Sequence, residues 1–403
     1  MLDEGSMEFL EVQDKVREKI KAFLDGYVNR KIEKIDDFME DMFSKEEACF
    51  VLGIGDEELC LGIKETREMV EVDWQSWGKL GLDIESLGIT TDGTSAYFTL
   101  DGTSTYCFQD SEERYERYIN SIASYFGENS VYRNLTYRAR LAQINWQLST
   151  LLSTRQEGVR EYLWPLKLSG FMCKEGDNWR FKSMQFAFKR ASRHPDVRFD
   201  TALSLDNVHA ESRERVHIFM LSNKEFYNSE VIKFAQKLQS HYLQSNNIDG
   251  LIDDGIFDNN IIISSTYGNT YRGFEDVKAF IELYKKFWDG ITVDYRRLLS
   301  LHFNEGAYFI ATGYLSRHVT QNQAIIEEVA NLKKTIKQDM PPKDKLFKIR
   351  KDISRTIMET FKGEDYICPV RIEGLAEKRE DGYSIVRLNF TLPSYWIMEG
   401  MYD

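Results

Sequence analysis

The residue with the clearest capacity for chemistry is Asp73, a carboxylate on one face of an amphipathic helix. Thr66, Val70, Asp73 and Trp77 follow one another at intervals of three or four residues, so they lie on one face of the helix. A buried carboxylate has a raised pKa unless it is paired, and in a cavity it can serve as a general acid or base. Asp73 also fits a structural role, as the acceptor of a hydrogen bond from an indole or a tyrosine hydroxyl.

Aromatic residues elsewhere in the first half of the chain are candidates for lining the same cavity. Ligand pockets are mostly apolar and aromatic, with a few placed polar groups. Each candidate, taken alone, also fits ordinary core packing. The candidate ligand-binding residues are Tyr27, Trp77, Tyr97, Tyr106 and Trp164.

Motifs that support metal or nucleophilic catalysis are absent from the sequence. It contains no His-Glu-x-x-His, no Gly-x-Ser-x-Gly and no P-loop. The 5 cysteines include no Cys-x-x-Cys pair. We therefore expect no metal and no cofactor, and we expect reduced cysteines in a cytoplasmic protein.

The segments that would position Asp73 occur twice in the chain. Residues 62–102 align without a gap on residues 273–313, and residues 162–186 align on residues 366–390. These 66 paired positions contain 15 identities, where about four are expected from average residue usage. The sequence is therefore interpreted as a tandem duplication.

The two copies differ at the position of the candidate catalytic residue. Gly62 opens the helix in the first copy and Gly273 opens it in the second, but Asp73 is replaced by Tyr284. The substitution removes an ionisable group and adds a ring. We expect the second cavity to be smaller and less polar, and the first copy to be the functional one.

Each copy begins with amphipathic helices and continues with strands separated by turns, which is typical of the α+β class. In the first helix, the apolar residues recur at helical spacing and predict one buried face, at Val16, Ile20, Phe23 and Tyr27. The expected domains are residues 7–200 and 225–403, with residues 201–224 as a connector. A helical hairpin interrupts the strands of each copy, at about residues 111–153 and 320–362. We expect these hairpins to cover the open end or flank of each sheet, because their apolar stripes need burial.

Several motifs of the first copy recur in a known family. They are D-W-x-x-W-G at Asp73–Gly78, W-P-L-K-L-x-G at Trp164–Gly170, the strand Asn178–Phe188 and P-D-V-R at Pro195–Arg198. Together they resemble the SnoaL-like family of the nuclear-transport-factor-2-like superfamily. The resemblance implies two tandem cones, each a curved antiparallel sheet wrapped around helices with a cavity at its wide end. That family hosts cyclases, isomerases, dehydratases, oligomerisation modules and proteins without known activity, so fold alone leaves function open.

The last strand of each copy departs from the family pattern. Members often carry histidine or serine there, whereas this chain has Gln185 and Ala187 in the first copy and Asn389 and Thr391 in the second. No role of that histidine is carried over to this protein.

Composition narrows the classes of partner. The net charge of -13 and the pI near 5.2 disfavour a sequence-independent nucleic-acid binder and an anionic membrane surface. No apolar run approaches the ~18 residues of a membrane span. The sequence favours a cavity protein that binds a small, largely apolar molecule, or an assembly module. The alternative is an acid/base enzyme of the isomerase, cyclase or dehydratase type that uses Asp73.

Large apolar residues on both faces of the last strands predict that the two copies pack sheet against sheet, as an intramolecular pseudo-dimer. Two cations, Lys167 and Arg371, lie in the middle of strands. They are interpreted either as an anion site or as pairing groups on the outer face of each sheet.

Overall fold

The computed structural model describes most of the chain. The P-D-V-R motif at Pro195–Arg198 and the expected end of the first domain at residue 200 lie outside the residues that the structure describes. Among the described residues, no helix combines the length and the hydropathy that a bilayer crossing requires. The described segments are 1–44, 48–109, 111–127, 135–154, 159–189, 205–243, 249–266, 268–304, 306–380 and 382–393.

The first half of the chain contains three N-terminal helices and a six-stranded sheet that a helical hairpin interrupts. A short 3-10 helix joins the first two helices. The elements are α1 (Met7–Asn29), η1 (Ile32–Lys34), α2 (Ile35–Met42), β1 (Phe50–Leu52), β2 (Leu59–Leu61), α3 (Ile63–Ser76), β3 (Lys79–Thr91), β4 (Ser95–Gln109), α4 (Glu112–Ser124), α5 (Tyr137–Thr154), β5 (Val159–Glu175) and β6 (Asn178–Phe188).

The second half repeats this order of helices, strands, hairpin and strands. Two short helical segments and α7 precede it. The elements are α6 (Leu205–Val208), α7 (Ala210–Ser222), η2 (Lys224–Phe226), α8 (Ser229–Leu243), α9 (Gly250–Asp253), β7 (Phe257–Ser264), β8 (Thr270–Arg272), α10 (Phe274–Lys285), β9 (Gly290–Val293), η3 (Tyr295–Arg297), β10 (Leu299–Phe303), β11 (Gly306–His318), α11 (Gln321–Lys337), α12 (Pro342–Thr360), β12 (Asp365–Arg379) and β13 (Gly382–Thr391).

The two sheets have the same strand order. The first runs β2-β1-β6-β5-β4-β3 and the second runs β8-β7-β13-β12-β11-β10, with β9 also paired to β11. The expected α+β class is confirmed. Each sheet also contains one parallel pair, β1 with β6 and β7 with β13, in addition to the expected antiparallel pairs. In each pair, the first strand of a half lies beside the last strand of that half and runs in the same direction.

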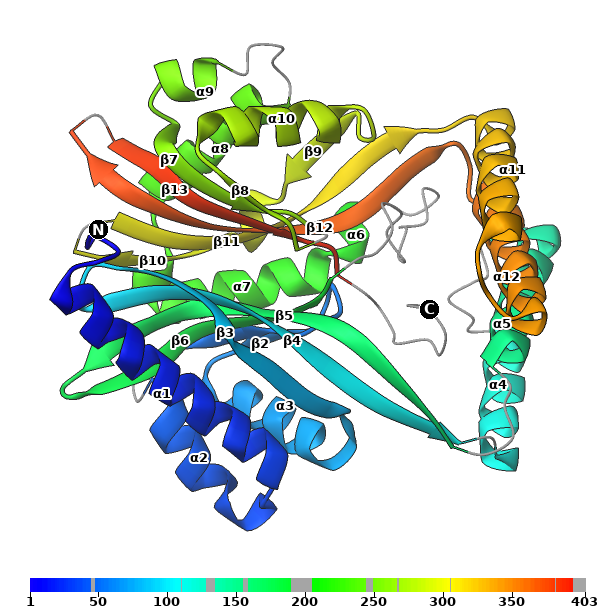
Figure 1. The fold of residues 1–403 in the computed structure, drawn as a ribbon, viewed down its shortest axis with the longest axis horizontal. Helices are drawn as coiled ribbons and strands as arrows, with labels where there is room; N and C mark the ends of the chain where they lie inside the picture. The colour runs from blue at the N-terminus through cyan, green and yellow to red at the C-terminus, as the bar shows by residue number, and fades with distance from the viewer. Residues whose placement is uncertain are drawn as a thin grey trace.

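Helices cover the outer face of each sheet. Figure 1 shows α1, α2 and α3 on one side of the molecule and α8, α9 and α10 on the other, with the two sheets between them. The predicted stripe of α1 is confirmed, because Val16, Ile20, Phe23 and Tyr27 are all buried against the first sheet. Helical periodicity alone therefore identified the inward face of this helix.

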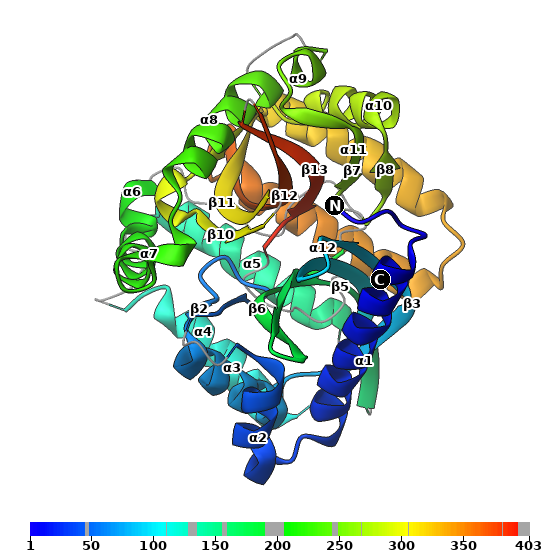
Figure 2. The ribbon, with the colours of Figure 1, turned by 90° about the vertical axis from the view of Figure 1, so that its left-hand side faces the viewer.

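The inner faces of the two sheets pack against each other. Phe171 of β5 stacks on Tyr308 of β11, with ring centroids 5.0 Å apart. Phe50 of β1 and Leu299 of β10 belong to the same buried cluster. Figure 2 shows α7 along one flank of both sheets, where Val216 joins this cluster. Burial between the sheets therefore links the two halves.

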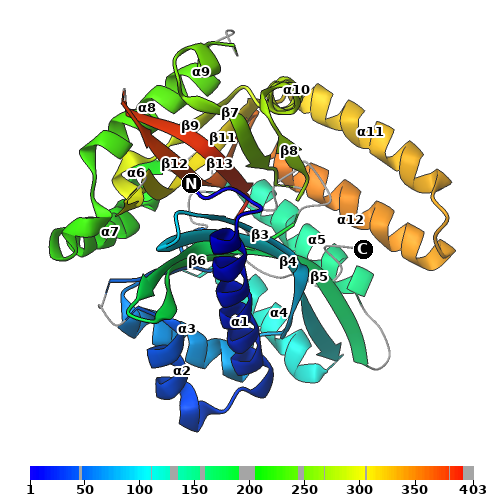
Figure 3. The same cartoon turned by 60° about the vertical axis from the view of Figure 1, so that its left-hand side comes forward.

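The helical hairpins pack on each other at one end of the sheets, where Asn145 of α5 and Ser354 of α12 are hydrogen-bonded at 3.1 Å (Figures 1 and 3). The expectation that their apolar stripes are buried is wrong. Leu141 is 60% exposed and Leu346 is 67% exposed. Hydrogen bonds between small polar side chains and the Arg138 guanidinium over the Phe361 ring join the hairpins, and much of the apolar stripe faces solvent.

A glycine begins the central helix of each half. Gly62 has a φ of 86° before α3, and Gly273 has a φ of 76° before α10. The Gly62 N–H donates to the Cys49 carbonyl at 2.7 Å, and the Gly273 N–H donates to the Ile261 carbonyl at 2.8 Å. Because side chains disfavour this backbone region, glycine suits both positions.

Candidate functional site

A cavity of about 740 Å³ opens in the first half, between α3, the β1–β2 loop, β6 and the start of α7. Its wall combines apolar and acidic side chains, and both α3 and the β1–β2 loop contribute both kinds. The larger apolar side chains in the wall are Ile54, Leu59, Met69, Val72, Trp77 and Phe186. The charged side chains in the wall are Glu57, Glu58, Glu65, Glu68, Asp73, Glu211 and Arg215.

Asp73 lies in the wall of this cavity, near the end of α3. The Tyr27 hydroxyl donates a hydrogen bond to Asp73 Oδ2 at 2.9 Å. Burial raises the pKa of Asp73 to about 7; the Tyr27 hydrogen bond opposes this rise, and the nearby Glu58 carboxylate adds to it. Near neutral pH, Asp73 therefore exists in both protonation states, which is the property that a proton-transfer group needs.

Arg30 holds the end of α3 in place. It ends α1 in the left-handed conformation, with a φ of 46°. Its guanidinium donates to the Trp77 carbonyl at 2.7 Å and also to the Gly78 carbonyl. These carbonyls have no partner within the helix, so an arginine from another helix satisfies them. The sequence did not identify this role, because a positive φ at arginine leaves no sequence signal.

Tyr27, which donates to the Asp73 carboxylate, packs with two further aromatic rings, Trp77 and Phe186. Trp77 lies 5.6 Å from Phe186 and 6.4 Å from Tyr27, measured between ring centroids. Tyr27 lies 6.4 Å from Phe186. Trp77 and Phe186 line the cavity, and Tyr27 is buried behind Asp73. Phe186 was not among the predicted binding residues. It lies two residues from Met184 and from Phe188, a spacing that puts all three side chains on the same apolar face of the strand.

Tyr106 and Trp164 form the core behind this wall. Their ring centroids are 4.7 Å apart, and Trp164 also packs at 5.5 Å from Phe188. Trp164 is completely buried in the core, and the described lining of this cavity does not include it. Tyr106 lies close to Gly78, since a Cβ at Gly78 would come within 2.7 Å of its ring. Tyr106 therefore packs behind Trp77 and is not part of the cavity wall.

Tyr97 lies away from this cavity, so its predicted place there is wrong. Phe98 faces the helices of the first half, and alternation along β4 turns Tyr97 toward the second sheet. Its hydroxyl donates to Glu373 Oε2 at 3.3 Å, and its ring lies 6.4 Å from Tyr308. Tyr97 is therefore an interface residue between the sheets.

A polar network surrounds Glu373 between the sheets. This buried carboxylate accepts hydrogen bonds from Tyr308 at 2.8 Å and from Asn389 at 2.9 Å. Asn389 Oδ1 in turn accepts from Lys167 Nζ at 2.9 Å. Burial lowers the pKa of Lys167 to about 8. Asn389 and Gln185, which depart from the family pattern, are thus both buried polar residues of this region.

A second cationic side chain also bonds across the sheets. The Arg371 guanidinium donates to the Gly53 and Gly55 carbonyls of the β1–β2 loop. Burial lowers the pKa of Arg371 to about 10, and Asp56 opposes this shift. Of the two interpretations, pairing describes both Lys167 and Arg371, but the pairing lies on the sheet faces that meet each other and not on an outer face.

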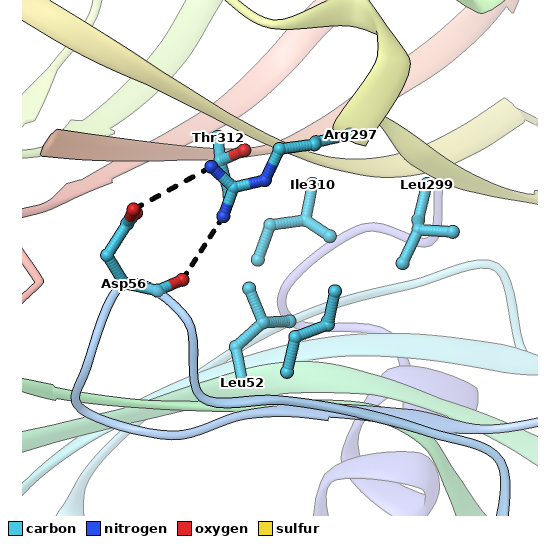
Figure 4. Close-up of a pocket in the computed structure, with 7 residues that line it drawn as sticks. Leu52, Asp56, Arg297, Leu299, Ile310 and Thr312 are labelled. Carbon is cyan, nitrogen blue, oxygen red and sulfur yellow. Dashed lines mark hydrogen bonds and ion pairs between the residues drawn. The ribbon is translucent and has the colours of Figure 1, made fainter. Parts of the chain in front are cut away.

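Asp56 and Arg297 meet at a small cavity of about 10 Å³ between the halves (Figure 4). Asp56 Oδ2 lies 3.7 Å from Arg297 Nη1. Asp56, Glu57 and His209 could offer three ligand atoms to a metal within 4.8 Å of one another. Arg297 Nη1 is 2.7 Å from His209 Nδ1. The guanidinium already supplies the positive charge there, so the cluster fits a buried ion pair better than a metal centre.

The sequence matches no protein-family model and no curated protein. Several solved structures are similar to part of the chain. A putative scytalone dehydratase from Novosphingobium aromaticivorans is 8% identical with a TM-score of 0.29, over 45% of this chain and 87% of that protein. A nuclear transport factor 2-like superfamily protein from Salmonella enterica is 10% identical with a TM-score of 0.29, over 47% of this chain and 98% of that protein. No activity is transferred to this chain at such values.

Proposed function

We propose that this chain is a cavity protein that binds a small, largely apolar molecule in its first half. The observation that carries the proposal is the cavity of about 740 Å³ whose wall includes Trp77, Phe186 and a carboxylate with a perturbed pKa. Ligand sites commonly have this size, and the aromatic and aliphatic part of the wall would bury an apolar group. The duplicated second half would act as structural support, in an intramolecular pseudo-dimer.

Filling the cavity tests this proposal. Val72 lines it and is 59% exposed, so Val72→Trp adds bulk there without disturbing the core. The aligned residue of the second half, Leu283, is 39% exposed and supplies the matched control Leu283→Trp. Calorimetric titration with phenylbutanol should show binding to the wild type and to Leu283→Trp, and a loss of about tenfold or more in Val72→Trp. Equal binding by all three proteins would contradict the proposal, as would no binding by any.

An acid/base enzyme remains the second candidate function. The observation in its favour is the pKa of Asp73, which burial raises to about 7. Asp73 would transfer the proton, and Tyr27 would position the carboxylate through its 2.9 Å hydrogen bond. A turnover screen with carbonyl and alcohol substrates, comparing wild type with Asp73→Asn, tests it. Turnover that survives in the variant would exclude Asp73 as the proton-transfer group.

A further inference from the structure

The cavity wall carries an excess of negative charge. It contains six carboxylates and one guanidinium, that of Arg215. Two of these carboxylates are paired with guanidinium groups, Glu65 with Arg215 at 2.6 Å and Glu57 with Arg297 at 3.6 Å. Glu58 accepts from the Gly55 N–H at 2.9 Å, a contact that positions the carboxylate and leaves its charge in place. Glu68 and Glu211 contribute two further carboxylates to the wall. An anionic ligand would therefore be repelled from this cavity, and a cationic one attracted.

The apolar part of the wall indicates what kind of cation fits. Trp77 and Phe186 both line the cavity, and aromatic faces attract organic cations in addition to burying apolar groups. Met69 and Val72 extend the apolar wall along α3. A bare metal ion would use neither the aromatic nor the aliphatic surface. An ammonium group on a hydrocarbon body would use both, together with the carboxylates.

We propose that the ligand of this cavity is a protonated organic amine with an apolar body, whose ammonium group is placed against the Asp73 carboxylate, beside the Trp77 and Phe186 rings. This inference rests on the proposed function, because the cavity is the site and its charge specifies the ligand. The hydrocarbon body lies along Met69 and Val72. The exposed Glu68 carboxylate adds negative charge to the cavity wall.

The position of Asp73 gives the proposal a distinctive signature. An ammonium ion beside the carboxylate favours its ionised form and lowers its pKa. Because that pKa is about 7 in the free protein, amine binding at pH 7 releases a fraction of a proton from Asp73. A neutral ligand has no charge to favour ionisation and releases none. The titratable groups that face Asp73 from the elements around it are Tyr27 of α1, Arg30 just after α1, Glu58 of the β1–β2 loop, Cys60 of β2 and Tyr106 of β4.

Three ligands of one shape test the charge preference: phenylbutylamine, phenylbutanol and phenylbutyrate. Titration calorimetry at pH 8 should show the amine binding about tenfold more tightly than the alcohol, and the carboxylate more weakly than either. Equal affinity for amine and alcohol would overturn this inference while leaving the proposed cavity function intact. Failure of all three to bind would count against the proposed function itself.

Variants locate the effect in the cavity. Glu68→Gln and Asp73→Asn should each lower the affinity for phenylbutylamine, by about threefold and about tenfold, with phenylbutanol affected little. Glu282→Gln removes an exposed carboxylate from α10 and is the matched control, expected to bind the amine like wild type. An equal loss in the Glu282→Gln control would show a general charge effect and overturn the assignment.

Proton release distinguishes direct contact between the ammonium group and Asp73 from a general effect of the negative charge in the wall. Calorimetry at pH 7 in phosphate and in Tris, whose ionisation enthalpies differ, should give different apparent enthalpies for the amine with wild type and with Glu68→Gln. The difference should vanish in Asp73→Asn. If Asp73→Asn does not fold, proton release by wild type with the amine, and its absence with the alcohol, still decides. No release in wild type would overturn the contact with Asp73.

Discussion

The Tyr27 hydroxyl donates a hydrogen bond of 2.9 Å to Asp73 Oδ2, joining the end of α1 to the end of α3 at the cavity wall. Tyr27 is fully buried, and burial together with the Asp73 charge raises its pKa well above the usual value. The phenol therefore stays protonated and remains a donor. The pair explains how a carboxylate is held in an aromatic wall, and it also implies a cost, because the ionised form of Asp73 is poorly solvated.

That cost predicts a pH-dependent stability. The pKa of Asp73 is raised from 3.8 to about 7 on folding, so the folded state binds more protons between these values. The contribution of Asp73 to stability consequently falls as the pH rises from about 4 to about 7. Asp73→Asn keeps the shape and removes the charge. We expect the variant to exceed wild type by about 1–3 kcal/mol in unfolding free energy at pH 8, with a smaller difference at pH 5.

Urea denaturation of both proteins at the two pH values measures this difference. Comparison at equal pH removes the contributions of the other titrating groups. A variant less stable than wild type at pH 8 would identify Asp73 as a structural hydrogen-bonding group. That result would contradict the prediction that burial of the ionised carboxylate lowers the stability of the wild type.

The Glu373 carboxylate should be a major contributor to the contact between the sheets. Glu373→Ala leaves Tyr308, Asn389 and Tyr97 without their shared acceptor, and we expect a loss of about 2–4 kcal/mol in unfolding free energy. Tyr97→Phe removes only the longest of these bonds, at 3.3 Å, and should cost about 1 kcal/mol. Chemical denaturation gives both values. A larger loss in Tyr97→Phe than in Glu373→Ala would contradict this ranking.

The buried Asp56–Arg297 pair should show strong energetic coupling. Arg297→Met removes the nearest cation from a buried carboxylate, with a loss of about 3–5 kcal/mol. Adding Asp56→Asn removes the uncompensated charge and should restore part of that loss. A double-mutant cycle should therefore give a coupling of about 1–3 kcal/mol. Additive losses would show that the two residues act independently despite their 3.7 Å separation.

The two helix-opening glycines should be equally intolerant of a side chain. Gly62→Ala and Gly273→Ala place a Cβ on backbones with φ values of 86° and 76°, and each should cost about 1–3 kcal/mol. Gly127→Ala is the control, because the nearest atom to its Cβ would be 4.0 Å away. Thermal unfolding should show that Gly127→Ala changes the unfolding free energy by no more than about 0.5 kcal/mol. A cost at only one of the two aligned positions would contradict their equivalence.

Local patterns in the sequence determined several features of the molecule. The spacing of Val16, Ile20, Phe23 and Tyr27 predicted the buried face of α1, and the structure confirms it. The position of Asp73 in its helix predicted an inward carboxylate, and Asp73 lies in the cavity wall. Helical periodicity involves residues within a few positions of each other, so the sequence displays it directly.

The tertiary structure decided which face of each strand meets which partner. Tyr97 alternates with a core residue, and only the docking of the second sheet shows that its hydroxyl meets Glu373, 276 positions away. Arg371 and the Gly53 carbonyl are separated by 318 positions. Such contacts depend on how two completed sheets pack, and no local spacing encodes that packing. For the same reason the sequence could not show that the hairpins pack through small polar residues and leave Leu141 and Leu346 exposed.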